Sequence, residues 1–156
     1  MCIRDSLYHA VDTPPLFHRP RGLYVTPRHL ARQLGELQAG RLAEFTTLGE
    51  WNRQRPSGRQ VAVTFDDAYR SLYVNGLPVL QELGVHAVTY VVVSFMGRSN
   101  EWDHGGGARH EPLMDRAHLG EWIDAGHEIG SQDVYKRQVL RLRDPNHRQR
   151  EGGDKT

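Results

Sequence analysis

The chain has 156 residues, of which 38% are hydrophobic and 25% charged, and its formal net charge is +1 at pH 7. This length corresponds to one domain or part of one, and it can bury a core. The 20 basic and 19 acidic residues nearly balance, which gives no reason to expect nucleic acid or an anionic membrane as a partner. The single cysteine, Cys2, excludes an internal disulfide framework, and no apolar run reaches transmembrane length.

The hexapeptides MCIRDS (1–6) and DVYKRQ (133–138) share one possible DNA sequence. Back-translation in two reading frames gives the string ATGTGTATAAGAGACAG in both, an agreement too long for chance. The string resembles a transposase adapter used in sequencing libraries. We therefore expect both hexapeptides to be adapter scars, and the natural N-terminus, with any signal peptide, to be missing. Residues 139–156 are unassigned and expected to be disordered or foreign, because they are charged and lack a sustained period.

The natural sequence, from 7 to 132, begins with a short strand and a helix. Residues 7–11 (LYHAV) predict the strand, and the prolines that follow predict a loop up to residue 22. Residues 26–40 predict the helix, with Thr26 as N-cap, Pro27 at its first position and a closing glycine. The next segment, EFTTLGEW, is ambiguous, although its second threonine, Thr47, could cap a short helix.

Further along, strand and helix patterns alternate. Residues 60–65 predict a strand that is apolar on both faces, which is typical of a parallel sheet covered on both sides. Residues 68–84 predict a helix weakened by Gly76 and Pro78, and residues 85–95 a second buried strand. After a loop comes a helix capped by Asp115, and HEIGS (127–131) predicts a third strand. That helix is expected to place Leu119, Trp122 and Ile123 on one face. The alternation indicates parallel α/β architecture.

Two adjacent carboxylates, Asp66 and Asp67, end the first buried strand. Ligands of parallel α/β folds bind at the carboxyl ends of the strands. Two like charges this close repel unless a positive group stabilises them, and a divalent cation would do so best. By themselves the residues also fit a solvated strand end with a helix cap, a receiver-type phosphoacceptor site or a magnesium phosphatase.

The wider context narrows these alternatives. The segment VAVTFDDAYRSLYVNGLPVLQELGVHAVTYVVV, followed by EPLM and HLGEWIDAGHEIGS, resembles the polysaccharide deacetylase family, carbohydrate esterase family four, whose domain is also called the NodB-homology domain. The first motif of that family is typically Thr-Phe-Asp-Asp-Gly, and residues 64–68 differ from it only at Ala68. GHEIGS resembles the lead-in to the second motif, His-Thr-x-x-His. The resemblance covers residues 7–131 and implies the N-terminal portion of an irregular (β/α) barrel.

The resemblance also implies roles for the acidic pair. Asp66 resembles the general base that deprotonates the attacking water, and Asp67 the carboxylate ligand of a divalent metal, zinc or similar, completed by two histidines. The implied activity is hydrolysis of carbon–nitrogen (non-peptide) bonds in an N-acetylated glycan, or of ester bonds in an O-acetylated one. The family implies a bacterial protein of the cell envelope or the extracellular space.

The chain departs from the family where the metal-binding histidines are expected. Gln132 occupies the position of the first ligand histidine, and Lys136 that of the second. An adapter that begins with A would turn the first two bases of a histidine codon, CA, into a glutamine codon. We therefore expect a truncated, inactive piece of a deacetylase. A non-catalytic carbohydrate-binding pseudo-enzyme is the alternative if Gln132 is natural. A receiver-like signalling domain is a further alternative, although the strand at 85–95 ends without the required aspartate.

Other residues could be mistaken for site residues. We interpret His127 as structural, His86 as a surface residue, and His104 and His110 as loop residues. His9 ends the first strand and could approach the acidic pair, and Trp102 could stack on a sugar or cover the core. Because a partial barrel leaves sheet edges and apolar faces unpaired, we expect marginal stability or aggregation.

Overall fold

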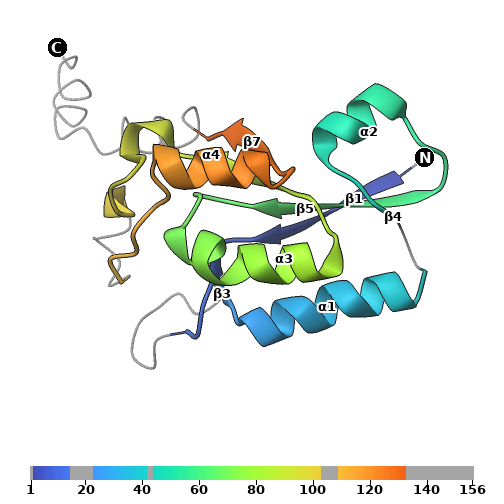
Figure 1. The fold of residues 1–156 in the computed structure, drawn as a ribbon, viewed down its shortest axis with the longest axis horizontal. Coiled ribbons are helices and arrows are strands. Elements are labelled where there is room, and N and C mark those ends of the chain that lie inside the picture. The colour runs from blue at the N-terminus through green and yellow to red at the C-terminus, as the bar shows by residue number, and fades with distance from the viewer. Residues whose placement is uncertain (1, 15–22, 42–43, 103–108, 133–156) are drawn as a thin grey trace, which may run out of the picture.

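The computed structural model describes residues 2–14, 23–41, 44–102 and 109–132, in which a parallel sheet lies among helices (Figure 1). The main sheet contains β1 (Cys2–Tyr8), β4 (Glu44–Phe45), β5 (Arg59–Phe65), β6 (Ala87–Val91) and β7 (Glu128–Ser131), and a second sheet contains β2 (Ala10–Val11) and β3 (Tyr24–Val25). The helices are α1 (Pro27–Ala39), α2 (Leu48–Gln54), the π-helix η2 (Leu72–Gly76), α3 (Leu77–Leu83), the 3₁₀-helix η3 (Val93–Phe95) and α4 (Arg116–Asp124).

The main sheet runs in the order β1-β5-β6-β7, and every pairing in it is parallel. β1 pairs along the whole of β5, with Tyr8 opposite Phe65. The other edge of β5 is shared: β4 pairs with its first half and β6 with its second half. The predicted parallel α/β architecture is confirmed. Since all strands run the same way, their carboxyl ends lie together at one end of the sheet.

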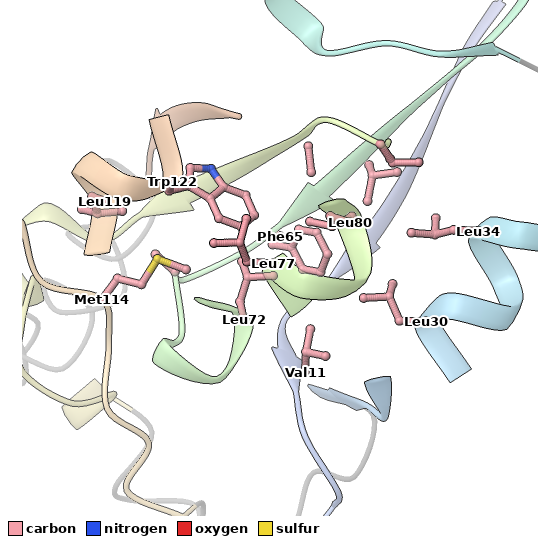
Figure 2. Packing of buried hydrophobic residues seen from close by; sticks show 14 of the residues in the cluster. Val11, Leu30, Leu34, Phe65, Leu72, Leu77, Leu80, Met114, Leu119 and Trp122 are labelled. Atoms are coloured by element: carbon pink, nitrogen blue, oxygen red, sulfur yellow. The ribbon is translucent and has the colours of Figure 1, made fainter. Parts of the chain in front are cut away.

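One large apolar core positions these elements. Phe65 of β5 lies 5.5 Å from the ring of Tyr8 and 6.4 Å from that of Trp122, measured between ring centroids. Figure 2 shows Phe65 with Leu72, Leu77, Leu80 and Trp122 gathered near it, and Leu30 and Leu34 of α1 beyond. The side chains of α1, α3 and α4 therefore meet in one core around β5, which holds the end of that strand firmly in place.

The predicted helix starts are confirmed. Thr26 caps α1 by accepting a hydrogen bond from the backbone N–H of His29 at 3.2 Å. Thr47 caps α2 in a capping box with Glu50, and Asp115 caps α4. Each cap depends only on residues within one turn of the helix, which explains why the sequence predicts it.

The first strand differs from the sequence prediction. It begins at Cys2, and the predicted strand at 7–11 is interrupted at His9, so that Ala10–Val11 forms a separate strand with Tyr24–Val25. The backbone of residues 2–6 pairs with β5. Strand pairing uses backbone groups that every residue carries, so this pairing is compatible with a foreign hexapeptide, and the adapter origin of residues 1–6 stays a prediction. Residues 133–156 lie outside the described residues.

The sequence prediction is confirmed for the helix after β5 and is partly wrong for α4. Gly76 and Pro78 do weaken the helix after β5, because the chain forms the π-turn η2 before α3 begins. The expectation for Ile123 is wrong: its side chain is 54% exposed, whereas Leu119 and Trp122 are buried. Ile123 lies about 100° round the helix from its neighbour Trp122, so a buried stripe centred toward Trp122 includes Leu119 and leaves Ile123 at its exposed margin.

Candidate active site

The acidic pair lies in a sharp turn at the carboxyl end of β5. Asp66 is half-buried and Asp67 is 4% exposed. Asp67 has φ 68° and Ala68 has φ 48°, so two successive residues adopt the left-handed conformation. Aspartate tolerates this conformation, whereas alanine loses about 1–2 kcal/mol in it. The motif of the resembling family has glycine at the position of Ala68, and the positive φ gives a physical reason for that preference.

A neighbouring segment holds this turn in place. The backbone N–H of Met114 donates to the carbonyl oxygen of Ala68 at 2.8 Å, and the N–H of Arg70 donates to that of Pro112 at 2.8 Å. Tyr69 and Leu113 form an antiparallel bridge and are both buried. The strain at Ala68 is therefore offset by backbone hydrogen bonds and burial, and the two carboxylates have a fixed backbone.

The end of β1 also contacts the acidic pair. The backbone N–H of Asp66 donates to the carbonyl oxygen of Tyr8 at 2.8 Å. The Nε2 atom of His9 lies 3.7 Å from the Oδ2 atom of Asp66. His9 thus approaches the site, as the sequence suggested it could. A hollow of about 390 Å³ extends from His9 between β1 and the start of α1, with Tyr24, Thr26 and Gln33 among its lining residues.

Gln132 follows β7 at the same end of the sheet. Its backbone N–H donates to the carbonyl oxygen of Val91 at 3.0 Å. Its side-chain oxygen is buried and has no hydrogen-bond partner in the described part of the chain. The described residues contain no group of three histidine, cysteine, aspartate or glutamate side chains that could hold a metal ion.

This donor set does not fit the zinc site that the family resemblance implies. Of the expected His-His-Asp set, the described residues supply Asp67 alone, and the amide of Gln132 is a poor zinc ligand. Lys136 lies outside the described residues. We therefore derive no catalytic step of this chain through a metal ion.

His127 and His86 lie away from the acidic pair. His127 precedes β7, and its Nδ1 atom accepts a hydrogen bond from the N–H of Ala87, the first residue of β6, at 3.1 Å. Its ring stacks on Trp122 with centroids 4.2 Å apart. Both contacts are at the amino ends of β6 and β7, opposite the end that carries Asp66 and Asp67. Burial, followed by the nearby His86, lowers the pKa of His127 to about 4. His127 is thus a buried, neutral structural residue, and His86 is exposed as expected.

The remaining candidates contribute to packing. Trp102 lies edge-on to Phe95, with ring centroids 5.1 Å apart, beside a cluster formed by Ala10, Tyr69 and Leu113. This position agrees with a residue that covers the core. His110 is exposed, and His104 lies outside the described residues. Another hollow, of about 860 Å³, is at the amino end of β5 beside Arg59 and Gly84, and is separate from the acidic pair.

Sequence reasoning missed a polar contact between β3 and the segment at 109–111, which is centred on the buried carboxylate of Glu111. The hydroxyl of Tyr24 donates to Glu111 at 2.8 Å, and Arg109 lies 3.6 Å from the same carboxylate oxygen. Burial first, and then the hydrogen bond to Glu111, raises the pKa of Tyr24. Tyr24 and Glu111 are 87 residues apart in sequence, so no local pattern could have joined them.

The sequence profile of one family, described as polysaccharide deacetylase, matches residues 53–145. The match includes the turn with Asp66 and Asp67 and covers more than half of the chain. The chain belongs to the polysaccharide deacetylase family. No curated protein matches it in sequence.

Solved structures of polysaccharide deacetylases share the fold. IcaB from Ammonifex degensii is 23% identical with a TM-score of 0.68, over 83% of this chain and 52% of IcaB. A polysaccharide deacetylase from Bacillus cereus is 21% identical with a TM-score of 0.66, over 83% of this chain and 38% of its own length. The Streptococcus pyogenes deacetylase PplD, solved with acetate, is 21% identical with a TM-score of 0.60, over 84% of this chain and 55% of PplD.

These likenesses place the chain in the fold of the family, the NodB (β/α) barrel. The chain spans about half the length of these solved relatives, or less. The described strands therefore correspond to a part of the barrel, as the sequence predicted. Within the described residues, no helix combines the length and the apolar character needed to cross a membrane.

Proposed function

We propose that the protein from which this chain derives hydrolyses acetyl groups from an acetylated polysaccharide, with Asp66 as the general base. Two observations carry the proposal. The chain belongs to the deacetylase family, and its paired carboxylates are held in a strained turn at the carboxyl end of β5, with Asp67 buried. Strained backbone that the surroundings hold in place is typical of functional sites. We also propose a bacterial cell-envelope or extracellular location, where such glycans occur.

The chemistry needs a base beside a water molecule. Asp66 is half-buried and keeps some contact with solvent. Its carboxylate would take a proton from water as the water oxygen attacks the acetyl carbon. The carbon–nitrogen bond then breaks, the amine leaves with a proton, and acetate is released. With an O-acetyl ester the carbon–oxygen bond breaks and an alcohol leaves.

For the present 156-residue chain we propose that turnover is absent. Asp67 would be the carboxylate ligand of a divalent ion, zinc or similar, in the intact protein. Here the first ligand position holds Gln132, and the described residues contain no group of three histidine, cysteine, aspartate or glutamate side chains that could hold the ion. A single carboxylate binds zinc weakly compared with a three-residue site.

A second candidate function rests on Gln132 itself. If this residue is natural, the domain is a carbohydrate-binding pseudo-enzyme that keeps the fold without the metal site. The receiver-like alternative is not supported, because the family profile that matches is that of a deacetylase.

The deciding experiment uses the intact gene. Its DNA would be sequenced from libraries made without transposase adapters, and the encoded protein assayed for acetate release from acetylated chito-oligosaccharides, peptidoglycan and exopolysaccharide. We expect histidines in place of Gln132 and Lys136. The encoded protein should release acetate, chelators should abolish this turnover, and Asp66→Asn and Asp67→Ala should each lose it. Glutamine retained at 132 with glycan binding but no turnover would favour the pseudo-enzyme. If MCIRDS and DVYKRQ reappear in the new sequence, the adapter hypothesis is wrong.

The present chain provides the matched control. It is expected to release no acetate above the buffer level, and its zinc titration by calorimetry should be the same as that of Asp67→Ala. Robust turnover that Asp67→Ala abolishes would overturn the proposal that this chain is inactive.

A further inference from the structure

His9 has no role in the chemistry described so far, yet its ring faces the proposed base. Its Nε2 atom is 3.7 Å from Oδ2 of Asp66, and the two side chains are 25% and 21% exposed. Among the described residues, His9 is the one cationic or imidazole side chain within 4 Å of this carboxylate. The contact joins β1 to the turn after β5 across 57 residues of sequence.

The backbone on both sides of His9 is firmly anchored. Tyr8 packs its ring on Phe65 and donates from its hydroxyl to Gln33 at 3.1 Å. On the other side, Ala10 and Val11 are almost completely buried and pair with β3. The side chain of His9 therefore projects from a rigid connection between two strands, as a positioning group requires.

The same strand end holds Asp66 by its backbone. The N–H of Asp66 donates to the carbonyl oxygen of Tyr8 at 2.8 Å. The end of β1 thus accepts a hydrogen bond from the backbone of Asp66 and also contacts one oxygen of its carboxylate. The contact of 3.7 Å is longer than an ordinary hydrogen bond, and contacts of this kind often tighten when a substrate binds.

From this geometry we infer that His9 is a positioning residue for Asp66. It holds Oδ2 of the carboxylate and leaves Oδ1 to accept the proton of the attacking water. This inference rests on the proposed role of Asp66 as the base. It assigns to His9 a role in orientation, and His9 itself exchanges no proton with the substrate.

The test measures the side-chain conformation of Asp66 without any substrate. Three-bond couplings from the backbone nitrogen and carbonyl carbon to Cγ of Asp66 report whether χ1 occupies one staggered rotamer or an average of three. In the unmodified chain we expect the couplings of one rotamer. His9→Phe keeps a ring but removes both nitrogens, and should give averaged couplings. His9→Gln keeps an N–H donor of similar reach, and should restore most of the single-rotamer values.

His29→Ala is the matched control, because His29 lines the same hollow from α1 and is not a contact of Asp66. It should leave the couplings unchanged. Single-rotamer couplings in His9→Phe, or averaged couplings in the unmodified chain, would overturn the inference. Amide spectra of β5 and β6 would verify that each variant is folded. If His9→Phe does not fold, His9→Ala takes its place and should show the same averaged couplings. Because no turnover is measured, failure here is distinct from failure of the proposed deacetylase activity.

Discussion

Glu128 is the residue that joins β7 to α2. Its two carboxylate oxygens accept hydrogen bonds from the hydroxyl of Thr47 at 2.6 Å and from the backbone N–H of Gly49 at 2.9 Å. Both donors are at the start of α2, where the first N–H groups of a helix need acceptors outside it. Thr47 also caps the helix, so Glu128 extends a local cap into a contact between elements that are 81 residues apart.

Removal of this carboxylate should loosen α2. Hydrogen bonds to charged groups contribute about 1.5–3 kcal/mol each, and partial exposure reduces this value. We expect Glu128→Ala to lower the free energy of unfolding by about 2 kcal/mol, and Glu128→Gln by about half of that. Urea denaturation measures both. Arg53→Ala is the control, because the Arg53–Glu128 contact is long at 4.0 Å and exposed, and its loss should change stability by less than about 0.5 kcal/mol.

His127 makes the stability of the fold depend on pH. In the folded chain its pKa is lowered to about 4, first by burial and then by His86, while an unfolded histidine has a pKa of about 6.5. Between these values the unfolded chain binds the extra proton. The contribution of neutral His127 to the free energy of unfolding is therefore fully present above about pH 6.5. It is lost as the pH decreases toward 4, by about 1.4 kcal/mol per pH unit at most.

The measurement compares the unmodified chain with His127→Gln at several pH values between 7.5 and 4.5. The variant should be less stable at neutral pH, and its stability should decrease less steeply below pH 6.5, because the other titrating groups are common to both proteins. Equal slopes in the two proteins would show that His127 does not titrate as this burial requires.

At the scale of elements, the helix glycines differ in what surrounds them. A Cβ atom at Gly76 would lie 2.7 Å from Cδ1 of Leu72 and 3.1 Å from Cγ2 of Val11, both in the core. A Cβ atom at Gly120, on α4, would meet nothing within 4 Å. The first glycine permits the close contact between η2 and β2, whereas the second has no such role.

The same substitution should therefore have opposite effects at these two positions. Alanine favours a helix over glycine by about 1 kcal/mol. Gly120→Ala should realise most of this gain and raise the free energy of unfolding by about 0.5–1 kcal/mol. Gly76→Ala should lower it by about 1–3 kcal/mol, because overpacking of the core outweighs the gain. Thermal unfolding of the two variants measures both effects. If Gly76→Ala stabilises the fold, the close packing of Gly76 against Leu72 and Val11 is wrong.

The elements that the sequence predicted are those specified by neighbouring residues. Thr26, Thr47 and Asp115 act within one helical turn, and the run at 60–65 is apolar because the sheet is covered, so both kinds of signal are visible locally. The position of Asp66 and Asp67 also followed from the end of a strand. The hydrogen bonds of Glu128 to α2 and the Tyr24–Glu111 pair were not predictable in this way, because tertiary packing brings these partners together from distant parts of the chain.

The whole molecule has a sheet edge that no described strand covers. β1 is the last strand in the order β1-β5-β6-β7, and it pairs on one side only within the described residues. Leu7, on this strand, is 54% exposed. The aligned part of this chain covers only 52% of IcaB and 38% of the Bacillus cereus deacetylase. An open edge with an apolar side chain is a template for pairing with another chain.

We therefore expect the chain to self-associate as its concentration rises, and a charge on the edge strand should oppose this association. Leu7→Lys should shift the sedimentation velocity profile toward the monomer at equal concentration. Val74→Lys is the matched control, because Val74 is 55% exposed but lies on η2, where its backbone groups are in a helix and offer no edge. If both lysine variants reduce association equally, general charge repulsion is the cause. If only Leu7→Lys does so, the association proceeds through the edge of β1, where an exposed apolar side chain lies on strand backbone that is unpaired within the described residues.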